Sequence, residues 1–234
     1  MLPVAILAGG LATRLRPATE RVPKSLLEVN GEPFVFHQLR LLQSRGIGRV
    51  VLCVGYLGEM VQQAVGSGRE LGLSVEYSFD GPSLLGTAGA IRQALPLLGE
   101  AFFVLYGDSY LACDYAAVER AFFDSGKPAM MTVFRNDGLW DTSNVEFAGG
   151  QLIAYSKRAH TPRMHYIDYG LGVFRASLFE RIAPGTACDL ADVYEGALQR
   201  GELAGYEVRE RFYEIGSPAG LRETAEFIAG ASRK

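Results

Sequence analysis

Cysteine and histidine are scarce in this chain of 234 residues, and their spacing excludes several kinds of site. The three cysteines, Cys53, Cys113 and Cys188, are odd in number and far apart, so they form neither a zinc-ligand spacing nor a disulfide framework. Cys53 lies in an apolar stretch, and we expect it in the core rather than as a reactive thiol. The three histidines also lack ligand spacing, so the sequence offers no metal site built from soft or imidazole ligands.

Long apolar runs and excess positive charge are absent as well. No run approaches the roughly 18 apolar residues that a membrane-spanning helix needs. The first residues lack the basic lead of a signal peptide, and Gly9 and Gly10 interrupt their apolar run. A net charge of −3 gives no broad positive field for nucleic acid or membrane surfaces. We therefore expect a cytoplasmic protein with no nucleic-acid or membrane partner. Whether it forms a homo-oligomer stays open.

The first half of the chain alternates strand-like and helix-like segments, which predicts a mostly parallel sheet covered on both faces. A hydrophobic content of 48% is enough for a large core. A short extended piece is expected at Ser25–Val29. The predicted strands are Val4–Leu7, Arg49–Val54, Leu73–Phe79, Ala101–Tyr106 and Ala129–Phe134, and the predicted helices run from Pro33 to about Gly46, from Gly58 to Val65, from Ala88 to about Leu95 and from Tyr115 to Phe123.

Beyond Asn136 the alternation changes, and a lid or secondary sheet facing the first half is expected. No repeat, low-complexity linker or domain boundary separates the two parts, so we predict one domain over residues 1–234. The predicted strands here are Asn144–Phe147, Leu152–Tyr155, Ile167–Phe174, Tyr206–Val208 and Phe212–Ile215, and the predicted helices are Leu190–Gln199 and Pro218–Ala229.

The first strand runs directly into glycines and then into basic residues. Gly9 and Gly10 let the backbone turn sharply and bring N–H groups close to a ligand. Arginine offers a bidentate fork for phosphate oxygens, and lysine a compact charge. The basic residues that follow within a short span are Arg14, Arg16, Arg21 and Lys24. The segment indicates a phosphate site, with an ordinary turn as the alternative; it is not a P-loop, because no G-x-x-x-x-G-K-[ST] occurs.

Two carboxylates follow apolar strand-like segments. Asp108 stands at the tip of one strand, and ligands bind at the carboxyl ends of strands in open parallel sheets. Glu214 follows Phe212 and Tyr213 near the end of the chain. Two carboxylates beside a group of cations suggest Mg²⁺ with a polyphosphate, although Asp108 alone could cap a turn. Trp140 could stack on a base or a sugar, or simply pack.

Taken together, these segments resemble the sugar-1-phosphate nucleotidyltransferase family. The family pattern G-G-x-G-T-R-L-x-P-x-T, followed by P-K, appears here as Gly9 to Thr19 with Pro23 and Lys24. The L-G-T-A-G loop corresponds to residues 85–89, and the strand-end G-D to Gly107 and Asp108. The terminal D-I-G-T-P is matched by residues 214–218. The resemblance covers essentially the whole chain. It implies an α/β fold, a Rossmann-like three-layer sandwich with a mixed, mostly parallel central sheet and a small sugar-facing β subregion.

The resemblance also implies roles for individual residues. Residues 1–135 would form the nucleotide-binding half and residues 136–234 the sugar-binding and C-terminal half. Arg14, Lys24 and Asp108 would be catalytic, and Asp108 with Glu214 would hold Mg²⁺. Lys157, Asp168 and Gly170 would contact the sugar phosphate and the sugar. The residues expected at the nucleotide are Leu7, Ala8, Gly9, Gly10, Thr13, Gly86, Thr87, Gly89 and Gly107.

Three positions depart from the family pattern. Ala12 stands where glycine is usual, Ser156 replaces a glutamate beside Lys157, and Glu214 replaces an aspartate. The resemblance implies conversion of a nucleoside triphosphate and a sugar 1-phosphate to a nucleotide sugar and pyrophosphate. Within the family the chain looks most like short guanylyltransferases acting on mannose 1-phosphate or D-glycero-D-manno-heptose 1-phosphate for surface polysaccharides. Uridylyl, thymidylyl or cytidylyl transfer stays open, as does a non-catalytic subunit that senses nucleotide sugars.

Overall fold

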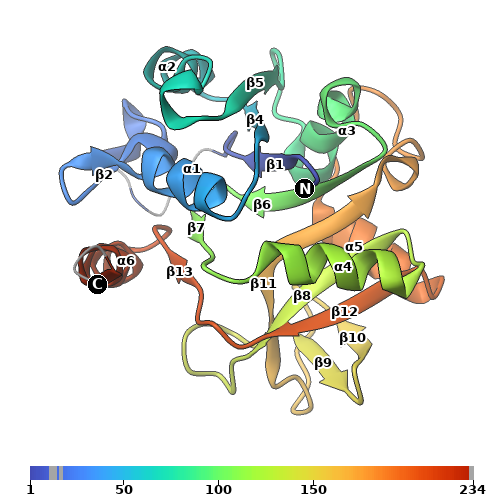
Figure 1. The fold of residues 1–234 in the computed structure, drawn as a ribbon. Coiled ribbons are helices and arrows are strands. Elements are labelled where there is room, and N and C mark those ends of the chain that lie inside the picture. Colours follow the sequence, from blue (N-terminus) through green and yellow to red (C-terminus); the bar gives the residue numbers. More distant parts are fainter. Residues whose placement is uncertain (11–14, 16–17, 232–234) are drawn as a thin grey trace.

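A computed structural model gives the structure of the protein and describes residues 1–10, 15 and 18–231. Over these residues a nine-stranded mixed sheet crosses the molecule (Figure 1). Its strands are β1 (Val4–Leu7), β4 (Arg49–Val54), β5 (Ser74–Phe79), β6 (Ala101–Tyr106), β8 (Ala129–Arg135), β9 (Val145–Ala148), β10 (Gln151–Tyr155), β11 (Tyr166–Arg175) and β12 (Leu203–Val208). The longer helices are α1 (Phe34–Ser44), α2 (Gly58–Val65), α3 (Gly86–Leu98), α4 (Tyr115–Ser125), α5 (Leu190–Gln199) and α6 (Pro218–Ala231).

One half of the sheet is parallel. Its strands lie in the order β5, β4, β1 and β6, and each pair is parallel. β1, β6 and β4 after Arg49 are apolar on both sides, as expected where helices cover both faces of a sheet, whereas β5 at the edge carries polar residues such as Glu76. Parallel strands end at the same edge, so the loops after β1, β4, β5 and β6 meet there. This edge carries the glycines and the aspartate that the sequence motifs contain.

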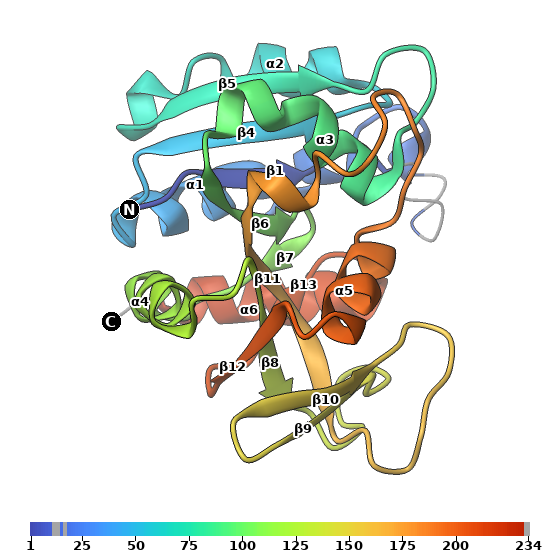
Figure 2. The same cartoon turned by 90° about the vertical axis from the view of Figure 1, so that its right-hand side faces the viewer.

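β11 makes the sheet mixed. It runs antiparallel between β6 and β8, and β12 lies parallel to β8 at the outer edge. The hairpin of β9 and β10 adjoins the start of β11 through the pair Tyr166–Val145 and lies at the end of the molecule opposite β5 (Figure 2). Because β11 is antiparallel to β6, the middle of β11 lies beside the last residues of β6, with Leu171 opposite Leu105. The expected sandwich with a mixed, mostly parallel sheet is confirmed.

Two hydrophobic layers cover the sheet. Alternate residues of one strand face opposite layers: Val4 and Ile6 of β1 pack toward one side, and Ala5 packs toward the other. The first layer contains α1, α2 and α4, and the second contains α3 and α5, which face the viewer in Figure 2. Cys53 is 1% exposed in the second layer, so its predicted place in the core is confirmed.

A third, smaller cluster fixes the end of the chain. β13 (Tyr213–Glu214) pairs antiparallel with β7 (Ser109–Tyr110), directly after the end of β6. Ile215 and Ile228 pack there with Val29 and Phe34. Val29 belongs to a two-residue ladder of β2 (Glu28–Val29) and β3 (Glu32–Pro33). The last helix therefore anchors β13 beside Asp108.

Several boundaries differ from those expected. Ser25–Val29 is not one extended piece, because residues Lys24–Leu26 form a 3-10 helix before β2. Helix α3 does not end near Leu95 but continues through Pro96 to Leu98. Leu98 is 1% exposed, and its burial stabilises this last turn of the helix. β12 begins at Leu203 rather than Tyr206, since Leu203 is buried opposite Ala129. Further 3-10 helices among the described residues are Ala18–Glu20, Arg69–Leu71 and Ala176–Leu178.

Candidate functional site

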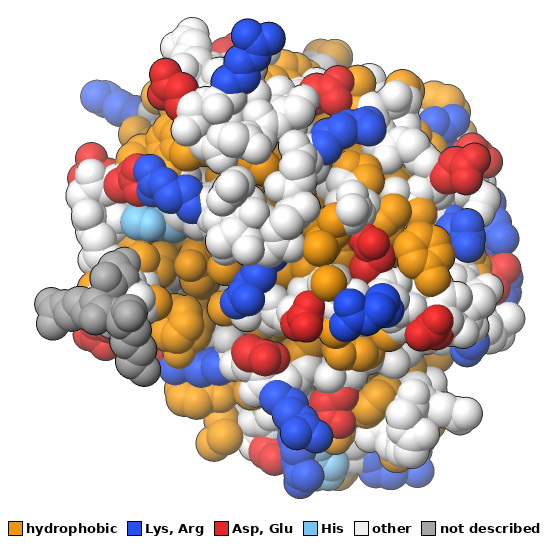
Figure 3. Space-filling model, in the orientation of Figure 1, with side chains coloured by type: hydrophobic (Ala, Val, Ile, Leu, Met, Phe, Trp, Pro, Cys, Tyr) orange, Lys and Arg blue, Asp and Glu red, His pale blue; other side chains and the backbone are white. Residues whose placement is uncertain are grey.

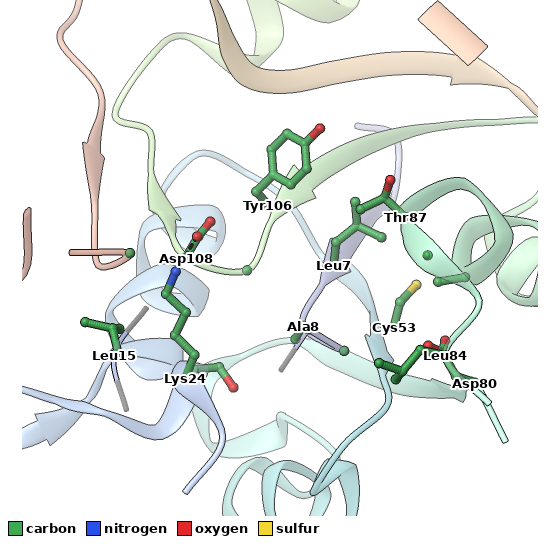
Figure 4. Close-up of a pocket in the computed structure, with 17 residues that line it drawn as sticks. Leu7, Ala8, Leu15, Lys24, Cys53, Asp80, Leu84, Thr87, Tyr106 and Asp108 are labelled. Atoms are coloured by element: carbon green, nitrogen blue, oxygen red, sulfur yellow. Dashed lines mark hydrogen bonds and ion pairs between the residues drawn. The ribbon is translucent and has the colours of Figure 1, made fainter. Parts of the chain in front are cut away.

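A cavity of about 390 Å³ opens where β1, β4, β5 and β6 end. The segments that line it are short, and five of the lining residues are glycines. Asp80 and Leu84 lie on the loop after β5, and Lys24 and Asp108 stand together at one end (Figure 4). Several of the residues predicted to bind a nucleotide line this cavity: Leu7, Ala8, Gly9, Gly10, Gly86, Thr87 and Gly107.

Glycines let the strand ends approach closely. A Cβ added to Gly107 would lie 2.6 Å from the Leu7 carbonyl oxygen, and one on Gly9 would lie 3.0 Å from the Gly55 nitrogen. The first of these contacts is shorter than real Cβ atoms tolerate, and its partner is backbone. Gly107 is therefore required to bring the end of β6 against β1, and the cavity wall depends on that contact.

The glycines at the start of α3 have a second function. Gly86 has a φ of +70°, and a Cβ there would meet the Cys188 carbonyl oxygen at 2.7 Å. A Cβ on Gly89 would meet the Thr186 carbonyl oxygen at 2.5 Å, and Gly89 lies outside the cavity lining. The backbone N–H of Ala88 donates to Cys188 at 2.9 Å. This first turn of α3 is thus packed against residues 186–188, and Ala88 donates to protein rather than to the cavity.

Lys24 and Asp108 form the charged end of the cavity. Lys24 Nζ donates to Asp108 Oδ2 at 2.6 Å, and the two side chains are 17% and 31% exposed (Figure 4). Lys24 lies on the 3-10 helix that follows the glycine segment, and Asp108 follows β6. A charge-assisted bond of this length is among the stronger hydrogen bonds in proteins. The structure therefore brings together two of the three predicted catalytic residues.

Glu214 reaches the same place from the end of the chain. The β13–β7 ladder sets Glu214 opposite Ser109, and the Ile215 N–H donates to the Asp108 carbonyl at 2.9 Å. The Glu214 carboxylate accepts from the Gly216 N–H and from Ser217 Oγ. A Cβ on Gly216 would lie 2.5 Å from Glu214 Oε2, 2.9 Å from Lys24 Nζ and 3.5 Å from Asp108 Oδ2. Three charged groups converge on one glycine.

This convergence fits a magnesium ion. Carboxylate oxygens are hard ligands, and Mg²⁺ is commonly held by one or two of them with phosphate oxygens completing the shell. Within the described residues, no group of three His, Cys, Asp or Glu side chains could hold a metal by itself. A metal at Asp108 and Glu214 would therefore depend on oxygen atoms from a bound substrate.

A second group of polar residues surrounds Tyr106, the last residue of β6. We call Tyr106, Lys157, Asp168, Gly170 and Asp189 the Tyr106 cluster. Lys157 Nζ lies 6.0 Å from the centre of the Tyr106 ring, and a Cβ on Gly170 would lie 3.4 Å from Tyr106 Cδ2. Tyr106 lines the cavity, whereas Lys157, Asp168 and Gly170 lie outside its lining. The tyrosine therefore stands between the cavity and the residues predicted to contact a sugar.

Asp168 is held within an irregularity of β11. The register of β11 against β8 shifts between Asp168 and Gly172, and Gly170 takes a φ of +93°. Gly170 N–H donates to Asp168 Oδ1 at 3.0 Å, and the Asp168 N–H donates to Asn144. Burial raises the pKa of Asp168 to about 6, although the Gly170 N–H and Lys157 favour its charged form. The cluster thus contains a carboxyl group that titrates near neutrality.

Asp80, Tyr106 and Asp189 were not predicted from the sequence. Asp80 lines the cavity, accepts a hydrogen bond from the Leu85 N–H at 3.2 Å, and has its pKa raised by burial. Its signal was its place after β5, which matches that of Asp108 after β6. Tyr106 immediately precedes Gly107, so its position at a strand end could have marked it. Asp189 joins the Tyr106 cluster through contacts with Lys157 and Thr87, which are distant from it in the sequence. No local sequence pattern marks such a residue.

The Trp140 ring packs against another side chain of the protein. The Arg211 guanidinium lies 3.4 Å from the centre of the Trp140 ring and 4.7 Å from that of Tyr213, and it pairs with Glu223. Trp140 remains 46% exposed. Its ring therefore packs on a residue that precedes β13.

Other predictions meet the structure only in part. Thr13, Arg14 and Ala12 lie outside the described residues. No helix within the described ranges is long and apolar enough to cross a membrane. On the face in Figure 3, Lys and Arg side chains are interspersed with Asp and Glu rather than gathered in one field.

Known proteins that are similar to this chain belong to the same family that the sequence motifs indicate. The profile of the nucleotidyl transferase family matches residues 4–230. An N-acetylmuramate alpha-1-phosphate uridylyltransferase from Neisseria meningitidis serogroup B is 32% identical over 97% of this chain and 97% of its own length. The mannose-1-phosphate guanylyltransferase catalytic subunit beta of Xenopus tropicalis is 29% identical over 91% of this chain, which spans 61% of that protein. HddC from Yersinia pseudotuberculosis, solved with GMP-PN, shares the fold at a TM-score of 0.82 and 21% identity, over 97% of this chain and 100% of that chain.

Proposed function

The chain belongs to the nucleotidyl transferase family and is a sugar-1-phosphate nucleotidyltransferase, and we propose that it uses GTP and a manno-configured sugar 1-phosphate for surface polysaccharide synthesis. A phosphate oxygen of the sugar 1-phosphate would attack the α-phosphorus of the nucleotide in line. The bond from the α-phosphorus to the bridging oxygen would break, and pyrophosphate would leave. No covalent enzyme intermediate is required, so catalysis would come from positioning and charge neutralisation.

The convergence of Lys24, Asp108 and Glu214 on Gly216 at the end of the cavity carries this proposal. Lys24 would exchange its contact with Asp108 for the reacting phosphates, and Gly9 and Gly10 would offer backbone N–H groups to them. Asp108 and Glu214 would hold Mg²⁺, which when bound would neutralise phosphate charge. Arg14, on the sequence pattern alone, is assigned to the departing pyrophosphate. Each of these groups acts on charge, which suits a reaction among phosphates.

The Tyr106 cluster would receive the second substrate. Lys157 would bind the phosphate of the sugar, while Asp168 and Gly170 would contact the sugar ring. These residues lie across Tyr106 from the cavity. A sugar 1-phosphate placed there would lie beside Tyr106, which lines the cavity.

Asp80 supports guanine as the base. It is a half-buried carboxylate on the cavity wall, and its Oδ2 already accepts from Leu85. A carboxylate accepts hydrogen bonds well, and guanine presents two neighbouring donors on its Watson–Crick edge, N1–H and the exocyclic amine. Uracil presents one donor between two acceptor oxygens, which a carboxylate repels. The guanylyltransferase relative agrees with this choice.

The second candidate is UTP with an N-acetylmuramate-type sugar 1-phosphate. It is favoured by the Neisseria relative, which is similar to this chain over nearly the whole length of both proteins. Rates of turnover with GTP and with UTP therefore decide which base the protein uses.

Pyrophosphate release with four nucleotides and three sugars tests both candidates. The panel pairs GTP, UTP, dTTP and CTP with the 1-phosphates of mannose, D-glycero-D-manno-heptose and N-acetylmuramate. We expect the highest kcat/KM with GTP and a manno-configured sugar, and Asp80→Asn should raise the KM for GTP about tenfold. Fastest release from UTP and N-acetylmuramate 1-phosphate would establish the second candidate instead. No release from any pair would contradict the proposed function.

A further inference from the structure

Asp189 is a three-way contact point that the family motifs do not include. It caps the N-terminus of α5, and its Oδ1 accepts hydrogen bonds from three different donors. The Ala191 N–H lies at 2.9 Å, Lys157 Nζ at 3.0 Å and Thr87 Oγ1 at 3.1 Å. One oxygen with three donors has little freedom to rotate, so the position of Asp189 fixes the positions of its partners.

The backbone around Asp189 is tied to the cavity wall. The Leu190 N–H donates to Thr87 Oγ1 at 2.6 Å, and the Cys188 N–H donates to the Leu85 carbonyl at 2.9 Å. Thr87 lines the cavity, where it points upward in Figure 4 beside Leu7. Any shift of the start of α3 would therefore move Asp189, and Asp189 in turn holds Lys157.

The ion pair has little value as a stabilising contact. The side chains of Lys157 and Asp189 are 39% and 47% exposed, and exposed pairs contribute little to the stability of a protein. Its effect is geometric, because a free lysine at the end of a hairpin samples many rotamers, and fixing them before a ligand arrives reduces the entropic cost of binding. The ammonium group has three hydrogens, and the bond to Asp189 uses one of them.

We propose that Asp189 is a positioning residue, which holds Lys157 at a fixed place relative to the nucleotide cavity so that its remaining hydrogens meet the phosphate of the sugar 1-phosphate. This inference rests on the proposed function of Lys157. Thr87 and Asp189 then connect the two substrate sites directly. The nucleotide would meet Thr87, and the sugar phosphate would meet Lys157, on either side of one carboxylate.

Asp189→Asn tests the proposal, since asparagine keeps the helix cap and a hydrogen-bond acceptor but removes the charge. With the fastest nucleotide and sugar pair, we expect the KM for the sugar 1-phosphate to rise about tenfold. The KM for the nucleotide and the melting temperature should stay nearly unchanged. Glu76→Gln is the matched control, because Glu76 forms an exposed ion pair with Arg49 on the opposite edge of the sheet, and it should alter neither KM.

A double-mutant cycle shows whether Asp189 acts through Lys157. Lys157→Ala alone should weaken the sugar 1-phosphate, and adding Asp189→Asn to it should cause no further loss. An undiminished effect of Asp189→Asn in the Lys157→Ala background would overturn the proposal. So would a lower KM for the sugar in Asp189→Asn, which would mean that Asp189 competes with the substrate for Lys157. If the wild-type protein turns over no pair, the proposed function fails, whereas normal turnover with an unaffected Asp189→Asn defeats only this inference.

Discussion

The cavity and the Tyr106 cluster differ in the parts of the chain that form them. Short loops after parallel strands line the cavity, and glycines at close backbone contacts hold these loops together. The Tyr106 cluster is made of side chains from an irregular strand, a hairpin end and a helix cap. The glycines at these contacts tolerate few substitutions, and such an invariant wall suits a ligand part shared by all nucleotides. Side chains can be exchanged singly, which suits the part of a substrate that differs between relatives.

Substitution of either residue of the Lys24–Asp108 pair should give the largest loss of activity. It tests whether the charged end of the cavity performs the reaction. Lys24→Ala or Asp108→Asn should lower kcat by about a thousandfold or more, because each removes charge stabilisation at the reacting phosphates. Pyrophosphate release under saturating substrates measures this loss. Far-ultraviolet circular dichroism and thermal melting should show that both variants remain folded. Near-normal turnover in either variant would remove that residue from the chemistry.

Gly216→Ala should have the next largest effect. The added Cβ would lie 2.5 Å from Glu214 Oε2 and 2.9 Å from Lys24 Nζ, so both side chains must move. Displacement of about 1 Å at a reacting centre costs on the order of a hundredfold, and we expect a fall in kcat of that size with a raised requirement for Mg²⁺.

Gly48→Ala is the control for this effect, since a Cβ on Gly48 meets no atom within 4 Å among the described residues. It should leave both the rate and the magnesium requirement unchanged. Equal activities of the two variants would mean that the convergence on Gly216 does not matter for the reaction.

Asp168→Asn should have the smallest effect on the reaction and separates the Tyr106 cluster from the cavity. Burial raises the pKa of Asp168 to about 6 from 3.8, so the folded protein binds this proton more tightly than the unfolded chain. The resulting stability is present below pH 3.8 and is lost as the pH rises to about 6. The uncharged asparagine avoids this loss, so the variant should gain up to about 3 kcal/mol over the wild type above pH 6.

Urea unfolding of the two proteins between pH 4 and pH 8 measures this difference. The gap in the free energy of unfolding should widen as the pH rises and then stay constant. Asp124→Asn, at an exposed position, serves as the control substitution. In the same Asp168→Asn variant the KM for the sugar 1-phosphate should rise, so stability would be gained where binding is lost. A gap independent of pH would contradict the raised pKa of Asp168.

The same contrast explains what the sequence could predict. Alternating apolar segments predicted a mostly parallel sheet, and parallel strands place Gly9, Gly107 and Asp108 at one edge by geometry alone. The place of Asp168 beside Tyr106 depends on β11 running antiparallel to β6, which apolar periodicity does not reveal. Asp189 and Gly216 matter through contacts with residues far along the chain. No local pattern specifies such contacts, so they required the structure.

The two-residue ladder of β13 and β7 has a consequence for the synthesis of the protein. Glu214 reaches Asp108 only through this ladder and the helix that anchors it. A nascent chain that has emerged as far as α5 already possesses every strand of the cavity wall, yet it lacks Glu214 and Gly216. On the proposed chemistry, such a chain would become a competent enzyme only after residues 214–216 have been translated and have reached Asp108.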